Sequence, residues 1–422
     1  MAPSFLLKDV QIFTGETTIP TGVVYVQNGS IAYVGESTPS IPDDTLVISK
    51  PGHTVIPGLI DAHIHADKGN PLALRQSLRF GVTTVMDMHN EIPNVVALKR
   101  QAASEPNTSA DFKTCGISAT IDGGWPIPVV TAHDKSEETA AEIATWPKLK
   151  TEEDATAYVT QNIADGADYF KLMHESGASL GQSFPKPTID LQKAVITAAH
   201  EKGFVTVAHA LCLADHLEVL EAGIDGLTHG FFDAPPTPEV IEAYKKNTAW
   251  LNPTLAAIGS LTTEGQGLAE KFAHDPRGGA LLGEREKGNL CRCMGFAKEG
   301  GTVKHAYELV KQLKAAGLDI IVGSDSAGPA LGTAWGLSLH HELNLFVKEC
   351  GFTPAEAIRA ATAVTAGRFG FADRGLIAPG RRADLVLVEG DVLGDIDASL
   401  NLRGVWRGGV LAGAFEGKVG GR

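Results

Sequence analysis

Short apolar runs separated by turn residues mark both ends of the chain. The runs lie at residues 5–13, 22–27, 30–35, 383–388 and 404–412. Runs of this length, bounded by Gly, Asn and Asp, are typical of β-strands. Asn28-Gly29, between two of them, is a strong hairpin signal. Because each end alone has too few strands to bury a face, we expect the two ends to pair in one small β-sandwich.

Between these ends, apolar runs alternate with helical patterns, which predicts repeated βα units and a parallel sheet. The candidate strands are Thr54–Ile60, Thr83–Met88, Lys113–Ala119, Tyr169–Met173, Val205–His209, Gly226–His229, Trp250–Leu255 and Ile320–Ser324. A helix over 304–316 would place Ala306, Leu309, Val310 and Leu313 on one face before the last strand. Eight such strands predict an α/β fold of the TIM type, a (β/α)8 barrel.

The pattern divides the chain into three segments. We expect residues 1–56 to form the N-terminal half of the β-sandwich, 57–372 the barrel, and 373–422 the C-terminal half of the β-sandwich. Two insertions, at about 120–150 and 256–302, are longer than ordinary βα loops. Loops of that length are usually functional lids, although surface elaboration or a contact between subunits would also explain them.

Composition narrows the class of protein. Of 422 residues, 43% are hydrophobic and 20% are charged, which is typical of a globular chain. The net charge of −14 disfavours nucleic acid and anionic membranes as partners. The start of the chain lacks a secretory pattern, and no run of about 18 apolar residues follows, so we expect a cytoplasmic protein. Five scattered cysteines, an odd number, predict free thiols.

A chelating pair of histidines ends the first predicted barrel strand. His63 and His65 are separated by one residue. Alternate side chains of a strand share a face, so both imidazoles would point into the barrel. An isolated pair with this spacing is more often a coincidence. Here it follows a buried-strand pattern at the end of the barrel where active sites lie, which favours a metal site.

Four more candidate ligands each stand at the carboxyl end of a predicted strand. They are Lys171, His209, His229 and Asp325. A single histidine in that position is more often a structural hydrogen-bonding residue. Six nitrogen and oxygen groups converging on one rim, with the pair above, predict a metal centre.

Lys171 is the unusual member, because it follows an apolar, inward-facing segment. An unpaired ammonium there is costly, which lowers its pKa toward the neutral amine. A neutral amine can react with carbon dioxide to form a carbamate, and that carboxylate is long enough to bridge two cations. The alternative is an ordinary lysine that extends to the rim or forms an ion pair with Asp325.

The motifs together resemble the amidohydrolase superfamily over nearly the whole chain. They are Pro57–His65, Gly81–Asp87, Lys171, His209, His229, Gly323–Asp325 and Gly375–Val386. The chain is similar in particular to the imidazolonepropionase-like group, which holds Xaa-Pro dipeptidases and ochratoxinase-type carboxypeptidases. The resemblance implies two divalent ions, zinc, bridged by Lys171 carboxylated at its side-chain nitrogen.

The resemblance also implies a role for each remaining ligand. His63, His65 and Asp325 would hold the more buried ion, and His209 and His229 would hold the other. A hydroxide shared by the two ions would be the nucleophile. Asp325 would be the catalytic residue that takes its proton and delivers it to the leaving nitrogen.

Other side chains on the same rim are candidates for substrate contact. His89 ends the second predicted strand, and His174 and Glu175 follow Lys171 closely. Asp67 is placed to orient a metal-bound imidazole, although an ordinary loop carboxylate is an equal alternative.

Two further motifs lie beyond the last strand. His340-His341-Glu342 resembles a metal pair but falls in an apolar-periodic helix over 335–347, where helix packing is the better interpretation. Gly332, Thr333 and Ala334 follow Asp325 and are candidate wall residues or simply a tight loop.

The sequence favours one function over three others. The first is hydrolysis of an amide bond in a small molecule, such as an N-acyl amino acid or a dipeptide, by a homo-oligomeric enzyme. A lactonase or cyclic amide hydrolase would use the same groups. A deaminase with one metal ion usually carries a glutamate shortly after the fifth-strand histidine, but after His209 none occurs until Glu218. A non-catalytic scaffold should have lost ligands.

Overall fold

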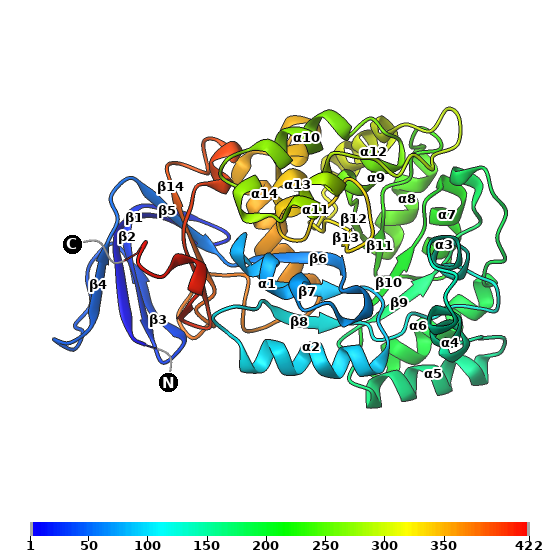
Figure 1. Cartoon of the computed structure of the whole chain (residues 1–422), viewed down its shortest axis with the longest axis horizontal. Coiled ribbons are helices and arrows are strands. Elements are labelled where there is room, and N and C mark those ends of the chain that lie inside the picture. Colours follow the sequence, from blue (N-terminus) through cyan, green and yellow to red (C-terminus); the bar gives the residue numbers. More distant parts are fainter. Residues whose placement is uncertain (1–2, 420–422) are drawn as a thin grey trace.

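Strands from both ends of the chain form one mixed sheet in the computed structural model, which describes residues 3–419 (Figure 1). Its members are β1 (Phe5–Phe13), β2 (Thr18–Gln27), β3 (Ser30–Gly35), β4 (Leu46–Ser49), β5 (His53–Pro57), β14 (Leu385–Glu389), β15 (Leu402–Arg407) and β16 (Val410–Leu411). The order is β16-β15-β14-β5-β1-β2-β3, with β4 beside β1. The two ends meet where β14 runs antiparallel to β5. The expected pairing of the two ends is therefore confirmed.

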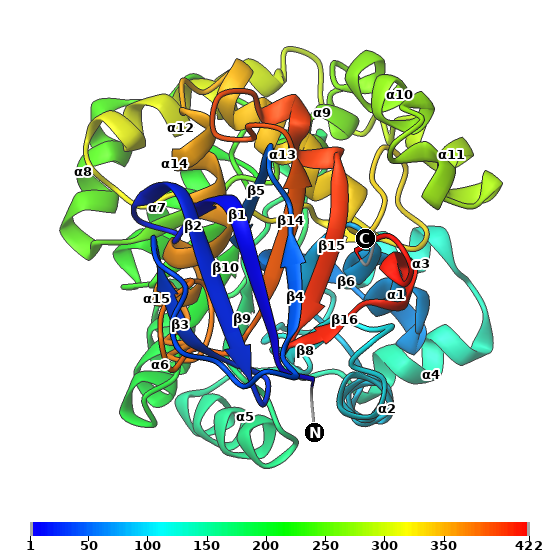
Figure 2. The same ribbon diagram turned by 90° about the vertical axis from the view of Figure 1, so that its left-hand side faces the viewer.

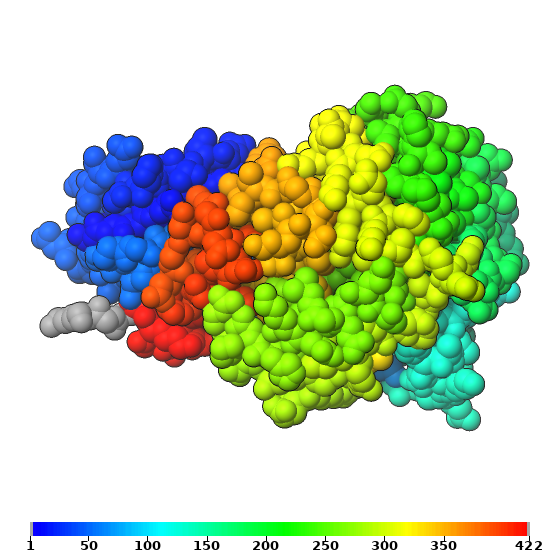
Figure 3. All heavy atoms as spheres, turned by 90° about the horizontal axis from the view of Figure 1, so that it is seen from above, coloured from blue at the N-terminus to red at the C-terminus, as the bar shows by residue number. Residues whose placement is uncertain are grey.

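The expected two-layered sandwich is instead one eight-stranded sheet. The length of β1 explains the difference, because β1 has a different partner along each half. Residues Phe5–Lys8 pair with β4, and Gln11 and Ile12 pair with β5. One long strand thereby places β4 and β5 in the same sheet. Figure 2 shows the blue N-terminal strands of this sheet beside the red C-terminal strands, and Figure 3 shows the N-terminal segment at one end of the molecule with the C-terminal segment next to it.

The hairpin between β2 and β3 turns at Asn28-Gly29, as predicted. Asn28 has a φ of 53° and Gly29 a φ of 83°. Two positive φ angles in succession are what a type I′ turn requires, and Asn followed by Gly is the pair that adopts them at least cost. Ser30 then pairs with Gln27, which sets the register of the hairpin.

The predicted strand 54–60 is two strands, because the chain changes sheets at Gly58. β5 ends at Pro57 in the mixed sheet, and β6 (Leu59–His65) opens a parallel sheet. A Cβ atom on Gly58 would lie 2.2 Å from Oγ1 of Thr83 and 2.9 Å from Cβ of Asp384. Only glycine fits this crossing between the two sheets.

Eight shorter strands make two parallel sheets. One has the order β13-β6-β7-β8, and the other has the order β12-β11-β10-β9. Their bounds are β7 (Val82–Asp87), β8 (Asp111–Thr114), β9 (Phe170–Met173), β10 (Thr206–His209), β11 (Gly226–Thr228), β12 (Trp250–Asn252) and β13 (Ser326–Ala327). Isolated parallel bridges between Ala119 and Leu172, and between Leu251 and Ile320, link the two sheets. This is an α/β fold with buried parallel strands.

The last predicted barrel strand, Ile320–Ser324, is the least regular. Only Ile320 forms a β-bridge, and β13 begins at Ser326. Asp325 between them has a φ of 51°, outside the extended region, so a continuous strand cannot pass through it.

Helices lie outside the parallel sheets (Figure 1). They are α1 (Leu72–Arg79), α2 (Ile92–Ser104), α5 (Glu152–Ala164), α6 (Ile189–Glu201), α7 (Leu213–Glu221), α8 (Pro238–Asn247), α12 (Val303–Ala315), α13 (Leu337–Lys348), α14 (Pro354–Arg359) and α15 (Thr365–Arg368). Short helical turns are η1 (Asp67–Gly69), η2 (Ala178–Leu180), η3 (Gly279–Leu281), η4 (Ala360–Val364), η5 (Ile396–Leu400) and η6 (Gly413–Phe415). The predicted helices over 304–316 and 335–347 correspond to α12 and α13.

Both insertions contain helices rather than open loops. The first holds α3 (Ile127–His133) and α4 (Glu137–Thr145), and the second holds α9 (Leu255–Leu261), α10 (Gln266–His274) and α11 (Glu284–Leu290). Over residues 3–419, none of the helices is long and apolar enough to cross a membrane. All five cysteines are free thiols, as predicted.

Candidate metal centre

His63, His65 and Asp325 lie together at the carboxyl end of β6. The Nε2 atoms of the two histidines are 3.3 Å apart, because alternate residues of the strand point to one side. Oδ1 of Asp325 lies 3.2 Å from Nε2 of His63 and 3.4 Å from Nε2 of His65. The three groups are close enough to share one cation.

A second pair of histidines lies beside the first. Nδ1 of His209, at the end of β10, is 3.0 Å from Nε2 of His229, which follows β11. Nδ1 of His229 is 3.6 Å from Oδ2 of Asp325, and its ring centroid is 5.0 Å from that of His63. The two carboxylate oxygens of Asp325 therefore face different histidine pairs.

The electrostatics of this cluster fit a divalent cation. Burial lowers the pKa of His63, His209 and His229 well below the ordinary value, and the Lys171 ammonium lowers it further. Neutral imidazoles that point nitrogens at one another need a shared proton or a cation between them. Nitrogen and carboxylate donors in this number are those of zinc and related metal sites in proteins.

Lys171, on β9, is fully buried beside these histidines. Burial lowers the pKa of its amine to about 8. The Nζ atom donates a hydrogen bond to Oγ1 of Thr228, at 2.7 Å. Among residues 3–419 it forms no ion pair with Asp325 within 4.0 Å, so the alternative that paired these two side chains is not what the structure shows.

Asp61 fixes the position of Asp325 and is an additional site residue that was not among those predicted from the sequence. Oδ1 of Asp61 accepts hydrogen bonds from the backbone N–H groups of His63 and Ser324, and Oδ2 accepts one from the Ser324 hydroxyl. Burial raises the pKa of Asp61 to about 7. The signal was its spacing, two residues before His63 on the same strand face.

The substrate-contact candidates occupy three different environments. Glu175 is buried behind His209, with Oε2 at 3.2 Å from Nε2 of that ring. His174 points into a separate cluster, where its Nε2 lies 2.8 Å from Oε2 of Glu218. His89 lines the large cavity, and its Nδ1 lies 3.1 Å from the Ser118 hydroxyl. Of the three, the structure brings His89 alone to the cavity wall, as far as residues 3–419 are concerned.

Two partners of the second histidine pair were also missed. The hydroxyl of Thr254 lies 2.7 Å from Nδ1 of His229. The indole of Trp125 stacks on the imidazole of His209, with centroids 5.2 Å apart and planes 20° apart. Thr254 lies in the predicted strand Trp250–Leu255 but beyond the end of β12, and Trp125 lies in the first insertion, so only the tertiary fold brings them to the histidines.

A cavity of about 860 Å³ opens above the cluster. Its floor holds the predicted ligands His63, His65, Lys171, His209, His229 and Asp325. Both insertions contribute to its walls, through residues such as Trp125 and Phe296. Thr333 and Ala334 line it too, as does Asp67, whose carboxylate accepts a hydrogen bond from the Gly328 N–H.

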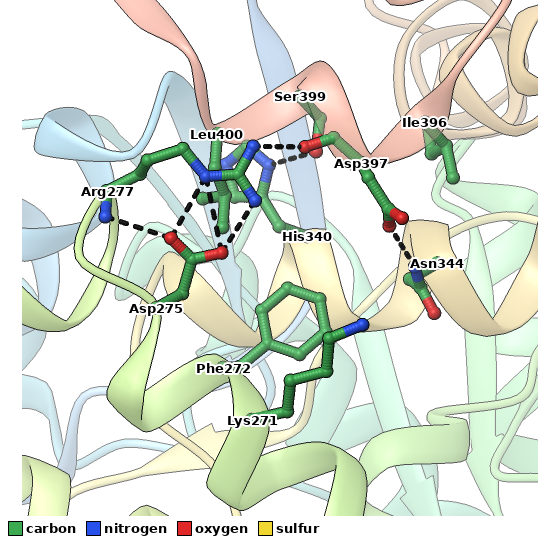
Figure 4. Close-up of a pocket in the computed structure, with 10 residues that line it drawn as sticks. All are labelled: Lys271, Phe272, Asp275, Arg277, His340, Asn344, Ile396, Asp397, Ser399 and Leu400. Atoms are coloured by element: carbon green, nitrogen blue, oxygen red, sulfur yellow. Dashed lines mark hydrogen bonds and ion pairs between the residues drawn. The ribbon is translucent and has the colours of Figure 1, made fainter.

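A smaller cavity of about 60 Å³, with none of these ligands in its lining, lies between α10, α13 and η5 (Figure 4). Its polar groups bond to one another: Arg277 donates to Asp275, and His340 lies 3.0 Å from the Ser399 hydroxyl. His340 also contacts the Phe80 carbonyl, so it packs the helix, as the sequence pattern indicated.

Comparison with known proteins identifies the family. A sequence profile described as the amidohydrolase family matches residues 54–419. The chain belongs to the amidohydrolase family. The resemblance predicted from its motifs is thus confirmed, and membership indicates a hydrolase.

Curated relatives of this amidohydrolase are more distant. An adenine deaminase from Ruegeria sp. (strain TM1040) is 24% identical over 382 residues, which is 86% of the chain and 50% of that protein. An imidazolonepropionase from Deinococcus deserti is 35% identical over 102 residues, 24% of the chain and 25% of that protein. The chain spans at most about half the length of the curated adenine deaminases that it matches.

Solved structures agree on the fold. A candidate prolidase from Bifidobacterium longum has a TM-score of 0.75 at 24% identity, covering 98% of this chain and 95% of that one. A Xaa-Pro dipeptidase with bound methionine also has a TM-score of 0.75, at 21% identity, covering 97% and 99%. At these identities, the likeness establishes the fold alone.

Proposed function

We propose that this amidohydrolase is a binuclear metal-dependent enzyme that cleaves an amide C–N bond in a small molecule, such as an N-acyl amino acid or a dipeptide. The observation that carries the proposal is the convergence of two histidine pairs on one carboxylate. Ring nitrogens of His63, His65 and His229 lie 3.2–3.6 Å from the two oxygens of Asp325, and His209 lies against His229.

Two zinc ions are proposed for this donor set. His63, His65 and Asp325 would hold one ion, and His209 and His229 the other. Lys171, carboxylated at Nζ, would bridge them, and its burial supports a neutral, reactive amine. When bound, such ions lower the pKa of water and polarise the scissile carbonyl.

The chain's own residues then carry the proton. Asp325 accepts the proton of the attacking water as the oxygen bonds to the carbonyl carbon. The same carboxyl passes this proton to the leaving nitrogen when the C–N bond breaks, so the products are a carboxylic acid and an amine. Two contacts hold Asp325 in place for both steps. The Asp325 backbone N–H donates to the His63 carbonyl at 2.8 Å, and Asp61 accepts a hydrogen bond from the backbone N–H of the preceding residue, Ser324.

We propose one (β/α)8 barrel for the two parallel sheets, with the bridges at Ala119 and Ile320 closing the ring. Residues 57–372 would form this domain, and residues 1–56 and 373–422 would form the second, of which residues 1–2 and 420–422 lie outside the described part of the chain. A homo-oligomeric assembly stays a prediction.

Deamination of a nucleobase is the second candidate, since the relative from Ruegeria is an adenine deaminase. The first glutamate after His209 does not favour it. Glu218 binds His174 and Lys186, with Oε2 at 2.8 Å and 2.7 Å from their nitrogens, and does not line the cavity. Lactone hydrolysis would use the same groups as amide hydrolysis.

A substrate screen tests these alternatives. Zinc-loaded protein would be assayed with N-acyl amino acids, Xaa-Pro dipeptides, small lactones and adenine, and kcat/KM compared between classes. We expect the highest value for an amide. A higher value for adenine than for any amide would overturn the proposal.

Metal analysis supplies the second arm of the test. We expect two zinc ions per chain under zinc- and bicarbonate-replete conditions, and fewer in His229→Gln. His200→Gln is the matched control, because His200 lies on α6 and bonds Asp225 away from the cavity. At most one ion in the unmodified chain would contradict a binuclear centre.

A further inference from the structure

The walls of the large cavity are apolar and come from both insertions. Trp125, Val129 and Val130 belong to the first insertion, and Met294 and Phe296 to the second. The ring of His133, on α3, packs edge-on against Phe296, with centroids 6.1 Å apart. The two insertions therefore meet across the cavity mouth and enclose the space above the histidines.

Two of the charged side chains in these walls, Lys68 and Glu91, are held by neighbouring groups. Nζ of Lys68 lies 3.0 Å from the carboxylate of Asp134. Glu91 accepts hydrogen bonds from the indole N–H of Trp146 and from the Asn94 amide. Such paired groups offer little to a ligand, and the side chains that the two insertions present beside them are mainly hydrocarbon and aromatic.

Trp125 links this apolar wall to the proposed catalytic floor. One face of its indole stacks on His209, and its edge lies near Phe184, with centroids 5.8 Å apart. Packing on two sides fixes the ring, while part of it stays open to the cavity. A rigid aromatic surface beside a reaction centre binds apolar groups at little cost in conformational entropy.

We propose that the substrate carries a bulky apolar acyl group, aromatic or long-chain, and that Trp125 is the residue that selects it. This rests on the proposed function. His209 and His229 would hold one of the ions, and Asp325 serves the leaving nitrogen. Because Trp125 stacks on His209, the apolar wall stands beside the reacting bond, and we assign this wall to the acyl group.

The size of the cavity agrees with this class. A volume of about 860 Å³ lies in the range of sites that take drug-sized ligands and is generous for a dipeptide. An acyl chain or ring packed along Trp125 and Val129 would displace water from these walls, which favours binding in proportion to the apolar area covered.

The test compares N-decanoylglycine with N-acetylglycine, as the ratio of kcat/KM and, by calorimetry, as the ratio of Kd. We expect the unmodified chain to prefer the decanoyl compound by about tenfold or more. Trp125→Ala should bring both ratios close to one, and Trp125→Phe should keep part of the preference. Phe272→Ala is the control, since Phe272 lies in the second insertion but faces the small cavity (Figure 4).

The two ratios separate failure of the apolar acyl site from failure of the proposed amide hydrolysis. Equal ratios in the unmodified chain, or ratios that Trp125→Ala and Trp125→Phe leave unchanged while both fold, would overturn the apolar acyl site and leave amide hydrolysis standing. If neither compound is cleaved but calorimetry still shows a preference that depends on Trp125, the apolar site is supported and the proposed reaction is wrong.

Discussion

At the scale of the residue, the proposed chemistry depends on Asp325. Asp325→Asn keeps the shape of the side chain but cannot accept a proton from water. Loss of general acid–base help of this type lowers turnover by about 10²–10⁴-fold. We expect kcat to fall by that much with little change in the free energy of unfolding. Metal content must be measured alongside, because the same oxygens face three histidines. Full activity at full metal content would rule Asp325 out as the proton carrier.

Lys171→Ala tests the proposed carbamate. The variant removes the side chain proposed to bridge the ions, so most activity should disappear. Acetate or propionate at millimolar concentration should restore part of it by supplying a carboxylate in the vacated space. The Thr228 hydroxyl, which accepts from Nζ in the native chain, would remain in place. Near-native turnover and metal content in the variant without added acid would make Lys171 an ordinary buried lysine.

Glu175 is expected to act through His209 rather than on the substrate. Its carboxylate contacts Nε2, so it fixes the proton there and leaves Nδ1 free to face His229. Glu175→Gln should weaken metal affinity by about 10–100-fold, measured by competition with a chelator. Glu218→Gln is the matched control, because Glu218 contacts His174 and Lys186 instead. Equal affinities in the two variants would remove this role from Glu175.

At the scale of the element, the sequence predicted most strands but not where they change sheets. Buried strands such as Thr206–His209 can be predicted from local composition alone. The crossing at Gly58 depends on Thr83 and Asp384, which come from distant parts of the chain, so no local pattern reveals it. The candidate site shows the same contrast between local pattern and tertiary contacts. The strand pattern was enough to predict which residues at strand ends lie together, whereas the position of Trp125 depends on how the first insertion folds back.

The second insertion is fastened to the rest of the molecule through Arg277. Its guanidinium pairs with Asp275 and donates to the Asp397 carbonyl at 2.7 Å (Figure 4). It also donates to Oδ1 of Asn401 at 3.1 Å. Arg277→Ala should lower the free energy of unfolding by about 1–2 kcal/mol. Hydrogen exchange should rise in α10 and α11.

Lys287→Ala is the matched control for this change. Lys287 pairs with nearby Glu284 on the surface of α11, and such a pair contributes about 0–1 kcal/mol. If Arg277→Ala leaves hydrogen exchange in α10 and α11 as slow as the control does, the insertion is held by its apolar contacts alone.

At the scale of the whole molecule, a cluster of charges joins the mixed sheet to the parallel strands. Asp111, on β8, accepts hydrogen bonds from Arg374, Arg382 and Arg407 at 2.6–3.2 Å. Burial raises the pKa of Asp111, but the three guanidiniums outweigh burial and hold that pKa below its ordinary value. Asp111→Asn should cost about 3–5 kcal/mol of stability, because it removes the negative charge that faces three largely buried guanidiniums.

The pH dependence of unfolding tests whether the negative charge of Asp111 stabilises the folded chain. A carboxyl whose pKa is lower in the folded state stabilises fully above its unfolded pKa of about 4, and this contribution is lost as the pH falls through the folded value. Urea unfolding between pH 7 and pH 2 should show the native chain losing stability faster than Asp111→Asn below about pH 4. Asp43→Asn, at an exposed loop position, should follow the native curve. A constant gap between native and Asp111→Asn curves would contradict the charge-based account.

The pairing of β5 with β14 has a consequence for how the protein is made. Pro57 faces Leu385, so roughly 300 residues must leave the ribosome after β5 is made before its second edge meets β14. At about 5–20 residues per second, the edge of β5 waits for tens of seconds with unpaired N–H and C=O groups. During that time the nascent chain offers a template to any other extended chain nearby, and a translation product that stops within the barrel never covers it. Biosynthesis of this amidohydrolase is thus most exposed to misassembly at the end of the chain that is made first.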